Sequence, residues 1–190
     1  MSTREILEYS KKIVTQLTDQ NDLAMAYINL GNEIVSKGKL DPTVPAFIAL
    51  HIFQAKKNPN GIVQAAMLIA NQLFNEAKYD HALNYLLLAD KQFNPMDKSK
   101  LKAYVLNKIG FVQFHLKHYA ESLNAFSACA VLFDSLGDPN EVAKTYCSLG
   151  LIYQDLKQPD RANELFQKAA DTARMGGNEA DALKYESLII

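Results

Sequence analysis

The sequence predicts an all-α fold, a right-handed α-solenoid of antiparallel helical hairpins with about ten helices. Two observations predict it. Residues of similar size recur at intervals of 40 along the chain, and short polar turns that contain proline divide it into segments of helical length. A fixed period of about 20 to 50 residues is typical of repeat architectures, in which each unit buries its apolar face against its neighbours.

The 40-residue interval is marked by small residues. Ala70, Gly110 and Gly150 lie 40 residues apart, and each follows Ile or Leu. Glycine or alanine at facing positions allows two antiparallel helices to approach closely, while a large side chain beside them fills the space to the next pair. After each of these residues the alternation continues with a small residue 12, a large one 16 and a small one 19 positions further on: Ala82, Leu86 and Ala89; Ser122, Phe126 and Cys129; Ala162, Phe166 and Ala169.

An earlier copy departs from this pattern. It contains Tyr27, Leu30, Gly31 and Ile34 and continues through Ala46 and Leu50, with three extra residues in the turn KLDPTVP. Two further residues depart from the pattern: Phe53 stands where the other copies have a small residue, and Gln113 stands where a buried aromatic is expected.

Prolines in polar turns place the helix boundaries. Pro42, Pro59, Pro95, Pro139 and Pro159 lie in such turns, and most of them stand where a helix would begin, the position at which a missing amide N–H costs least. The predicted helices cover residues 3–18, 22–37, 44–57, 61–76, 79–93, 98–116, 119–136, 140–156, 160–174 and 178–188.

Composition excludes several classes of protein. The formal net charge of -1 argues against a nucleic-acid binder, which needs cations to neutralise phosphates. The apolar runs are too short for a membrane span, and residues 1–21 lack the apolar stretch of a signal peptide. Cys129 and Cys147 lie within apolar helical patterns, which predicts reduced thiols and a cytoplasmic protein without a disulfide.

The best copy of the repeat resembles the tetratricopeptide repeat (TPR) family, because it contains Tyr146, Leu149, Gly150, Tyr153, Ala162, Phe166 and Ala169 at the family's spacing. The period of 40 is longer than the usual 34 of that family and is similar to the repeats of kinesin light chains and Rap-type regulators. The resemblance implies one TPR-like domain over residues 1–190, with repeats at about 24–58, 63–97, 103–138 and 143–177 and cap helices at 3–18 and 178–188.

The same resemblance implies a partner-binding concave surface lined by the first helix of each hairpin. Carried over by position, the predicted surface residues are Met25, Ile28, Asn32 and Val35; Gln64, Met67, Asn71 and Phe74; Tyr104, Asn107, Phe111 and Phe114; and Lys144, Cys147, Leu151 and Gln154. Of these, Asn32, Asn71 and Asn107 could pair with the amide N–H and C=O of an extended peptide. The alternative is that Phe111, Phe114 and Met67 only pack and that the asparagines are solvated.

Other polar residues indicate no chemistry. His115 and His118 are three residues apart, but no third ligand stands at a suitable spacing, so no metal or other cofactor is expected. Cys147 lacks the partnered His and Asn of a cysteine nucleophile. Lys108 and Lys144, with Asn71, match the groove that grips chaperone carboxylates only poorly. An enzyme is therefore not expected.

The predicted function is a scaffold or adaptor that binds a peptide or helix of a partner protein in its concave groove. A self-assembling structural protein is one alternative, because the apolar end Leu188, Ile189 and Ile190 could contact the terminal helix of another copy. A secretion-type chaperone is the other.

Overall fold

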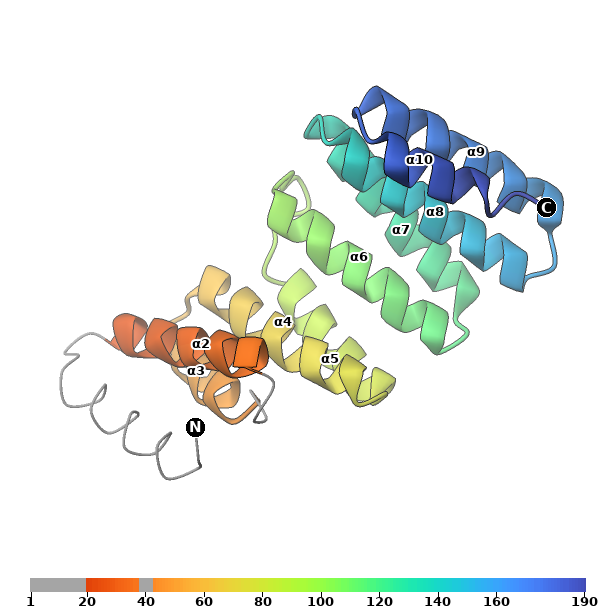
Figure 1. The fold of residues 1–190 in the computed structure, drawn as a ribbon. Helices are drawn as coiled ribbons and strands as arrows, with labels where there is room; N and C mark the ends of the chain where they lie inside the picture. The colour runs from red at the N-terminus through yellow and green to blue at the C-terminus, as the bar shows by residue number, and fades with distance from the viewer. Residues whose placement is uncertain (1–19, 38–42) are drawn as a thin grey trace. The chain divides into compact units, whose positions relative to one another are not determined.

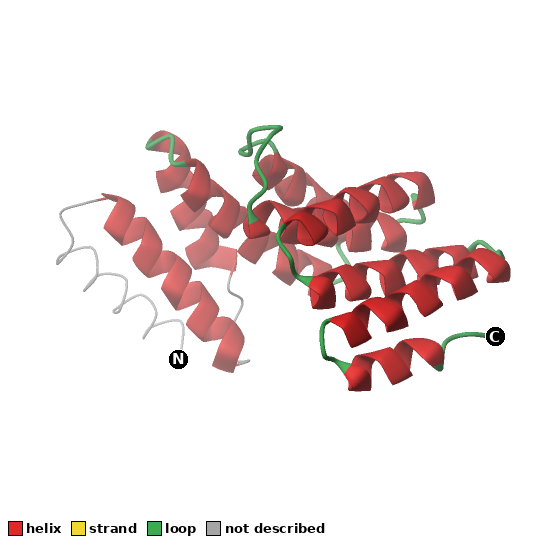
Figure 2. Ribbon diagram, turned by 90° about the horizontal axis from the view of Figure 1, so that it is seen from above, coloured by secondary structure: helices red, strands yellow, loops and turns green. Residues whose placement is uncertain are grey.

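The computed structural model describes residues 20–37 and 43–190, and the side chains within residues 21–32 and 43–190. All regular structure in these segments is helical, with helices joined by short loops (Figure 2). The predicted helix at residues 3–18 lies outside the described residues. So do residues 39–42, the first four residues of the turn KLDPTVP.

Nine helices occur in the described residues, and each matches a predicted one with boundaries that differ by three residues or fewer. They are labelled in Figure 1: α2 (Gln20–Lys37), α3 (Thr43–Ala55), α4 (Pro59–Asn75), α5 (Tyr79–Asp90), α6 (Lys100–His115), α7 (Tyr119–Ser135), α8 (Pro139–Asp155), α9 (Pro159–Met175) and α10 (Glu179–Glu186). The prediction of an all-α solenoid is confirmed.

The two kinds of turn in the repeat begin their helices differently. The first helices α4, α6, α8 and α10 have an N-cap side chain that accepts a hydrogen bond from the backbone N–H three residues on: Asn58, Ser99, Asp138 and Asn178. The second helices α5, α7 and α9 have no side-chain cap. A left-handed residue precedes each of them, with φ of 56° at Ala77, 63° at Lys117 and 59° at Lys157, so the tight turn within each hairpin repeats every 40 residues. The first helices α4, α8 and α10 also follow a left-handed residue, so the side-chain cap is what distinguishes the two kinds of turn.

The helices form two compact units, one ending at Asn94 and the other covering Pro95–Ile190. In the first unit α2 packs against α3 and α4, α3 packs against α4, and α4 packs against α5. In the second unit each helix from α6 to α10 packs against the next one in the chain. Within each unit the second helix of a hairpin therefore contacts the first helix of the following hairpin.

The predicted close approach within hairpins is present at two glycines of the second unit. A Cβ added to Gly110 would lie 2.8 Å from the Phe126 ring, and one added to Gly150 would lie 2.6 Å from the Phe166 ring. Both rings are fully buried. The Ser122 hydroxyl also donates a 2.8 Å hydrogen bond to the Gly110 carbonyl, so the small residue of the second helix fixes the approach as well.

In the first unit, residue sizes compensate in two places. The positions equivalent to Gly150 and Phe166 hold Ala70 and Leu86, a larger and a smaller residue, and both are buried. Phe53, which departs from the repeat pattern, is fully buried, and a Cβ on Gly61 of α4 would lie 2.2 Å from its ring. Phe53 is therefore accommodated because the next helix has a glycine opposite it.

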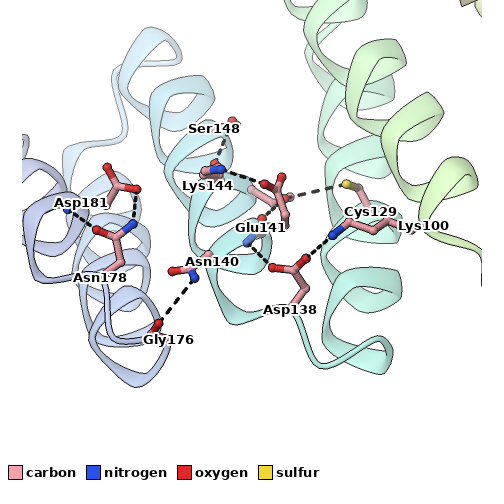
Figure 3. Close-up of polar contacts among 11 residues, drawn as sticks. Lys100, Cys129, Asp138, Asn140, Glu141, Lys144, Ser148, Gly176, Asn178 and Asp181 are labelled. Carbon is pink, nitrogen blue, oxygen red and sulfur yellow. Dashed lines mark hydrogen bonds and ion pairs between the residues drawn. The ribbon is translucent and has the colours of Figure 1, made fainter.

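Ion pairs join successive hairpins of the second unit at both ends. At one end, Lys100 Nζ lies 2.8 Å from Asp138 Oδ2, while Oδ1 of the same carboxylate accepts the backbone N–H of Glu141 at the start of α8 (Figure 3). The ammonium group of Lys100 holds the pKa of Asp138 below its usual value. At the other end, Lys117 Nζ lies 2.9 Å from Asp155 Oδ2.

We expect Gly150→Ala to destabilise the protein, because overpacking costs about 1 to 3 kcal/mol and exceeds the helix-propensity gain of about 0.5 to 1 kcal/mol from replacing glycine. Adding Phe166→Leu recreates the Ala70 and Leu86 combination and should recover part of the loss. Urea unfolding of wild type, both single variants and the double variant measures the coupling. Additivity within about 0.5 kcal/mol would contradict direct contact at this position.

The two roles of Asp138 predict different pH dependences for two variants. Asp138→Asn keeps a good N-cap residue and removes the charge, whereas Asp138→Ala also loses the cap, at a cost of about 0.5 to 2 kcal/mol. Because the folded-state pKa of Asp138 is lowered, its carboxylate stabilises the fold above the unfolded-state pKa of about 3.9, and this stabilisation is lost as the pH falls through the folded-state value.

The stability gap between wild type and Asp138→Asn should therefore close on acidification, while the gap between Asp138→Asn and Asp138→Ala persists. Urea midpoints at pH 7 and pH 3 test both statements. A gap between wild type and Asp138→Asn that is equal at the two pH values would show that the pair with Lys100 contributes nothing.

Candidate functional site

A pocket of the second unit lies where α6 and α8 end. Its volume is about 780 Å³, and its lining residues are Phe114 of α6, Leu151, Gln154 and Asp155 of α8, Lys157 and Pro159 at the start of α9, and Ile190. A smaller cavity of about 100 Å³ shares Phe114 and Leu151 with it and adds Phe111, His115, Phe126 and Ser148. We call the two together the Phe114–Leu151 pocket. It brings together four predicted surface residues: Phe111, Phe114, Leu151 and Gln154.

The aromatic floor of the pocket is anchored in the hairpin core. Phe111 meets the buried Phe126 ring edge to face with centroids 5.0 Å apart, and Phe114 meets Tyr119 in the same way at 6.2 Å. Lys117 Nζ lies 5.4 Å from the centroid of the Phe114 ring. Phe111 and Phe114 are consequently half-buried, whereas Leu151 is 37% exposed and is the open apolar contact of the pocket.

The charged rim of the pocket is largely self-neutralised. Asp155 accepts hydrogen bonds from the Tyr119 hydroxyl and the Lys117 ammonium group. These two donors, Tyr119 first, hold the pKa of Asp155 below its usual value, so the carboxylate is ionised at neutral pH. The exposed side chain of Lys157 adds a second cation at the rim. The pocket thus has an apolar floor and a rim of one amide, one ion pair and one lysine.

The other predicted residues of the second unit have contacts within the protein. Tyr104 packs edge to face on the buried Phe133 at 5.3 Å. Asn107 is half-buried and hydrogen-bonds to the Cys129 thiol. Lys144 Nζ lies 2.7 Å from Glu141 Oε1 on its own helix, as Figure 3 shows. Asn107 and Lys144 are therefore engaged by the protein itself.

In the first unit, Ile28 is only 3% exposed and belongs to the core, so its side chain does not reach the surface. Met25 and Asn32 of α2 are exposed, and the side chain of Val35 lies outside the described residues. The predicted residues of α4 are all half-buried, and Phe74 packs edge to face on Tyr79 at 5.4 Å. These α4 residues are Gln64, Met67, Asn71 and Phe74.

Within residues 20–37 and 43–190, no three His, Cys, Asp or Glu side chains group in a way that could hold a metal. His118 Nδ1 lies 2.8 Å from Gln113 Oε1, which gives a local role to the glutamine that departs from the repeat pattern. Cys129 and Cys147 are free, and burial raises the pKa of each thiol to about 11, which is the opposite of what a nucleophile needs. Among the described helices, none combines the length and apolar character that a membrane span requires.

The residues that sequence reasoning missed come from the last residue of α8, the turn into α9, the first residue of α9 and the end of the described chain. Asp155, Lys157, Pro159 and Ile190 line the pocket beside the first-helix residues. These four residues do not stand at the first-helix positions from which the binding surface was predicted. One signal was available for Lys157 and Pro159, because the turn KQPD directly follows the predicted helix that carries Leu151 and Gln154.

Comparison with known structures identifies the fold. The chain resembles the STAND ATPase with a tetratricopeptide repeat sensor from Pyrococcus horikoshii, at 17% identity over 95% of this chain, with a TM-score of 0.77. It resembles a Rap protein complexed with Competence and Sporulation Factor, at 19% identity over 87% of this chain, with a TM-score of 0.67. PilF of Pseudomonas aeruginosa is similar at 24% identity over 90% of this chain and 77% of its own, with a TM-score of 0.60.

Sequence identities this low show only that these proteins share the fold of this chain. The chain spans only 29% of the ATPase and 45% of the Rap chain. Its sequence matches none of the curated proteins.

The family comparison adds a match in sequence. Residues 101–175, which include α6 to α9 almost completely, match the tetratricopeptide repeat family. Stacked repeats of this kind form extended concave surfaces that can bind other proteins. The repeat register and the stacked hairpins agree with this match, so residues 101–175 are identified as tetratricopeptide repeats and the described chain shares the fold of tetratricopeptide repeat proteins.

Proposed function

We propose that this protein is a scaffold that binds a peptide segment or a helix of a partner protein at the Phe114–Leu151 pocket of its second unit. The observation that carries the proposal is that residues expected on the binding face of two successive hairpins meet at one apolar pocket. Phe114 comes from α6, and Leu151 and Gln154 come from α8.

The size and chemistry of the pocket suit a side-chain anchor. Ligand pockets are typically about 300 to 1,000 Å³ and combine an apolar lining with a few polar groups that fix orientation. Here Phe114, Leu151 and Pro159 supply the apolar lining, and Gln154 and Lys157 supply polar contacts. Lys117 and Asp155 neutralise each other's charge, so the pocket favours an apolar anchor over a charged one.

Two further parts of the proposal concern the rest of the chain. The exposed or half-buried first-helix residues of the first unit form a second candidate surface within that unit: Asn32, Gln64, Met67, Asn71 and Phe74. We also propose a cytoplasmic location, because Cys129 and Cys147 are free thiols.

Leu151→Glu is the variant that tests the binding surface. The side chain is partly exposed, so the substitution should leave the fold intact while placing a charge in the apolar pocket, and partner binding should fall at least tenfold. Phe111→Glu is a poorer test, because Phe111 packs on the buried Phe126 and its loss would also disturb the core. Affinity capture of the partner from native lysate, with recovery quantified by mass spectrometry, measures the effect.

Val131→Glu is the matched control. Val131 is 69% exposed on the second helix α7 and lines neither cavity of the pocket, so the same change in charge and size should leave capture unchanged. Circular dichroism of both variants checks the fold. If folded Leu151→Glu captured as much partner as wild type does, the partner would not bind at the Phe114–Leu151 pocket.

A further inference from the structure

The segment after α10 brings Ile190 back to α9. Leu188 and Ile189 donate backbone hydrogen bonds to Tyr185 and Glu186 of α10, and Ile190 is held by the side chain of Asn163. The Asn163 side-chain amide donates a 2.9 Å hydrogen bond to the Ile190 main-chain oxygen, and the Ile190 backbone N–H donates a 3.1 Å hydrogen bond to Asn163 Oδ1. One asparagine thus satisfies both main-chain groups of one residue. This is the pairing that an asparagine can offer to any extended peptide, because it does not depend on the side chain of the bound residue.

Asn163 departs from the repeat at this position. The positions 40 and 80 residues earlier, on the second helices α7 and α5, hold the half-buried Leu123 and Leu83. The hairpin packs with a leucine there, so the repeat fold does not require an amide. In the described structure, the amide of Asn163 is instead used on Ile190.

Ile190 also belongs to the Phe114–Leu151 pocket, since it lines the larger cavity beside Phe114, Leu151 and Pro159. Its side chain nevertheless remains 85% exposed, so it lies at the edge of the pocket and leaves most of the apolar lining unfilled. Little apolar burial therefore opposes the departure of Ile190, whereas Leu188 is half-buried.

Helix α10 is attached by separate contacts. Arg174 of α9 forms ion pairs with Glu186 at 2.7 Å and with Glu179 at 3.2 Å, and Tyr185 is buried against the alanines of α9. Ile190 can therefore leave Asn163 while α10 stays in place and Leu188 and Ile189 remain hydrogen-bonded to its last turn.

We propose that the Phe114–Leu151 pocket is a binding site for an extended aliphatic peptide segment paired through its main chain with Asn163, and that Leu188–Ile190 of this chain is its resident, displaceable ligand. This inference rests on the proposed function and names its ligand chemistry. A partner segment takes the place of Ile190 on Asn163 and inserts an aliphatic side chain between Phe114, Leu151 and Pro159. The tethered segment competes with it at the high effective concentration of an intramolecular ligand.

The test uses a fluorescein-labelled peptide with the sequence of Lys184–Ile190 (KYESLII) and a C-terminal amide, titrated in fluorescence anisotropy. Deleting Leu188–Ile190 from the protein should increase its affinity for this peptide at least tenfold over the full chain, because the internal competitor is removed. In the deletion background, Asn163→Leu restores the residue of the other hairpins, which favours folding, and should weaken binding at least tenfold. A control peptide with serine in place of both isoleucines (KYESLSS) should bind weakly.

Two results would overturn the inference: equal affinity of the full chain and the deletion variant, or undiminished binding by the deletion variant that also carries Asn163→Leu. Failure of the proposed function is a separate outcome. If the peptide binds as expected while Leu151→Glu leaves partner capture unchanged, the pocket binds the segment but not the partner. If Leu151→Glu abolishes capture while the peptide does not bind, the groove function stands and the resident ligand is rejected.

Discussion

The fold of the second unit depends on the close contact of two helices at a glycine. At Gly110 and Gly150 the first helix of a hairpin has no side chain, so the Phe126 or Phe166 ring of the second helix lies against its backbone. A single buried aromatic thereby fills the hairpin and sets the distance between its helices. In the first unit the equivalent positions hold Ala70 and Leu86, and both are buried. Phe53 fits there because Gly61 lies opposite its ring.

This contact also positions the candidate site. Because Phe126 fills the hairpin interior, Phe111, which directly follows Gly110 in α6, packs on it and remains half-buried, and Phe114 lies about one turn further along. Leu151 presents its side chain from the equivalent position of the next first helix, 40 residues after Phe111. The ion pair of Lys117 with Asp155 then links the turns that close the two hairpins, beside the pocket. The proposed binding surface is thus the outer side of the same packing that forms the core.

Much of the fold could be predicted from the sequence, because helix length, proline position and the 40-residue register are local or periodic properties. The site could be predicted only in part. The register shows which residues share a face, but it does not show that Glu141 neutralises Lys144 or that Asn107 turns toward Cys129. The burial of Ile28 depends on the fit of α2 against its neighbours. The pairing of Asn163 with Ile190 joins two residues 27 positions apart, and Ile190 lies beyond the end of α10. No periodic pattern of the sequence indicates this pairing. The division after Asn94 has no counterpart in the register either.

Site-specific photocrosslinking tests the central claim most directly, namely that partners bind the Phe114–Leu151 pocket. A benzophenone amino acid at position 151, and separately at position 131, would be irradiated with the full-length protein in native lysate. The account predicts a discrete protein adduct at position 151 that grows weaker when excess unlabelled KYESLII peptide is added, and no such adduct at position 131. An adduct at position 131 with none at position 151 would contradict it.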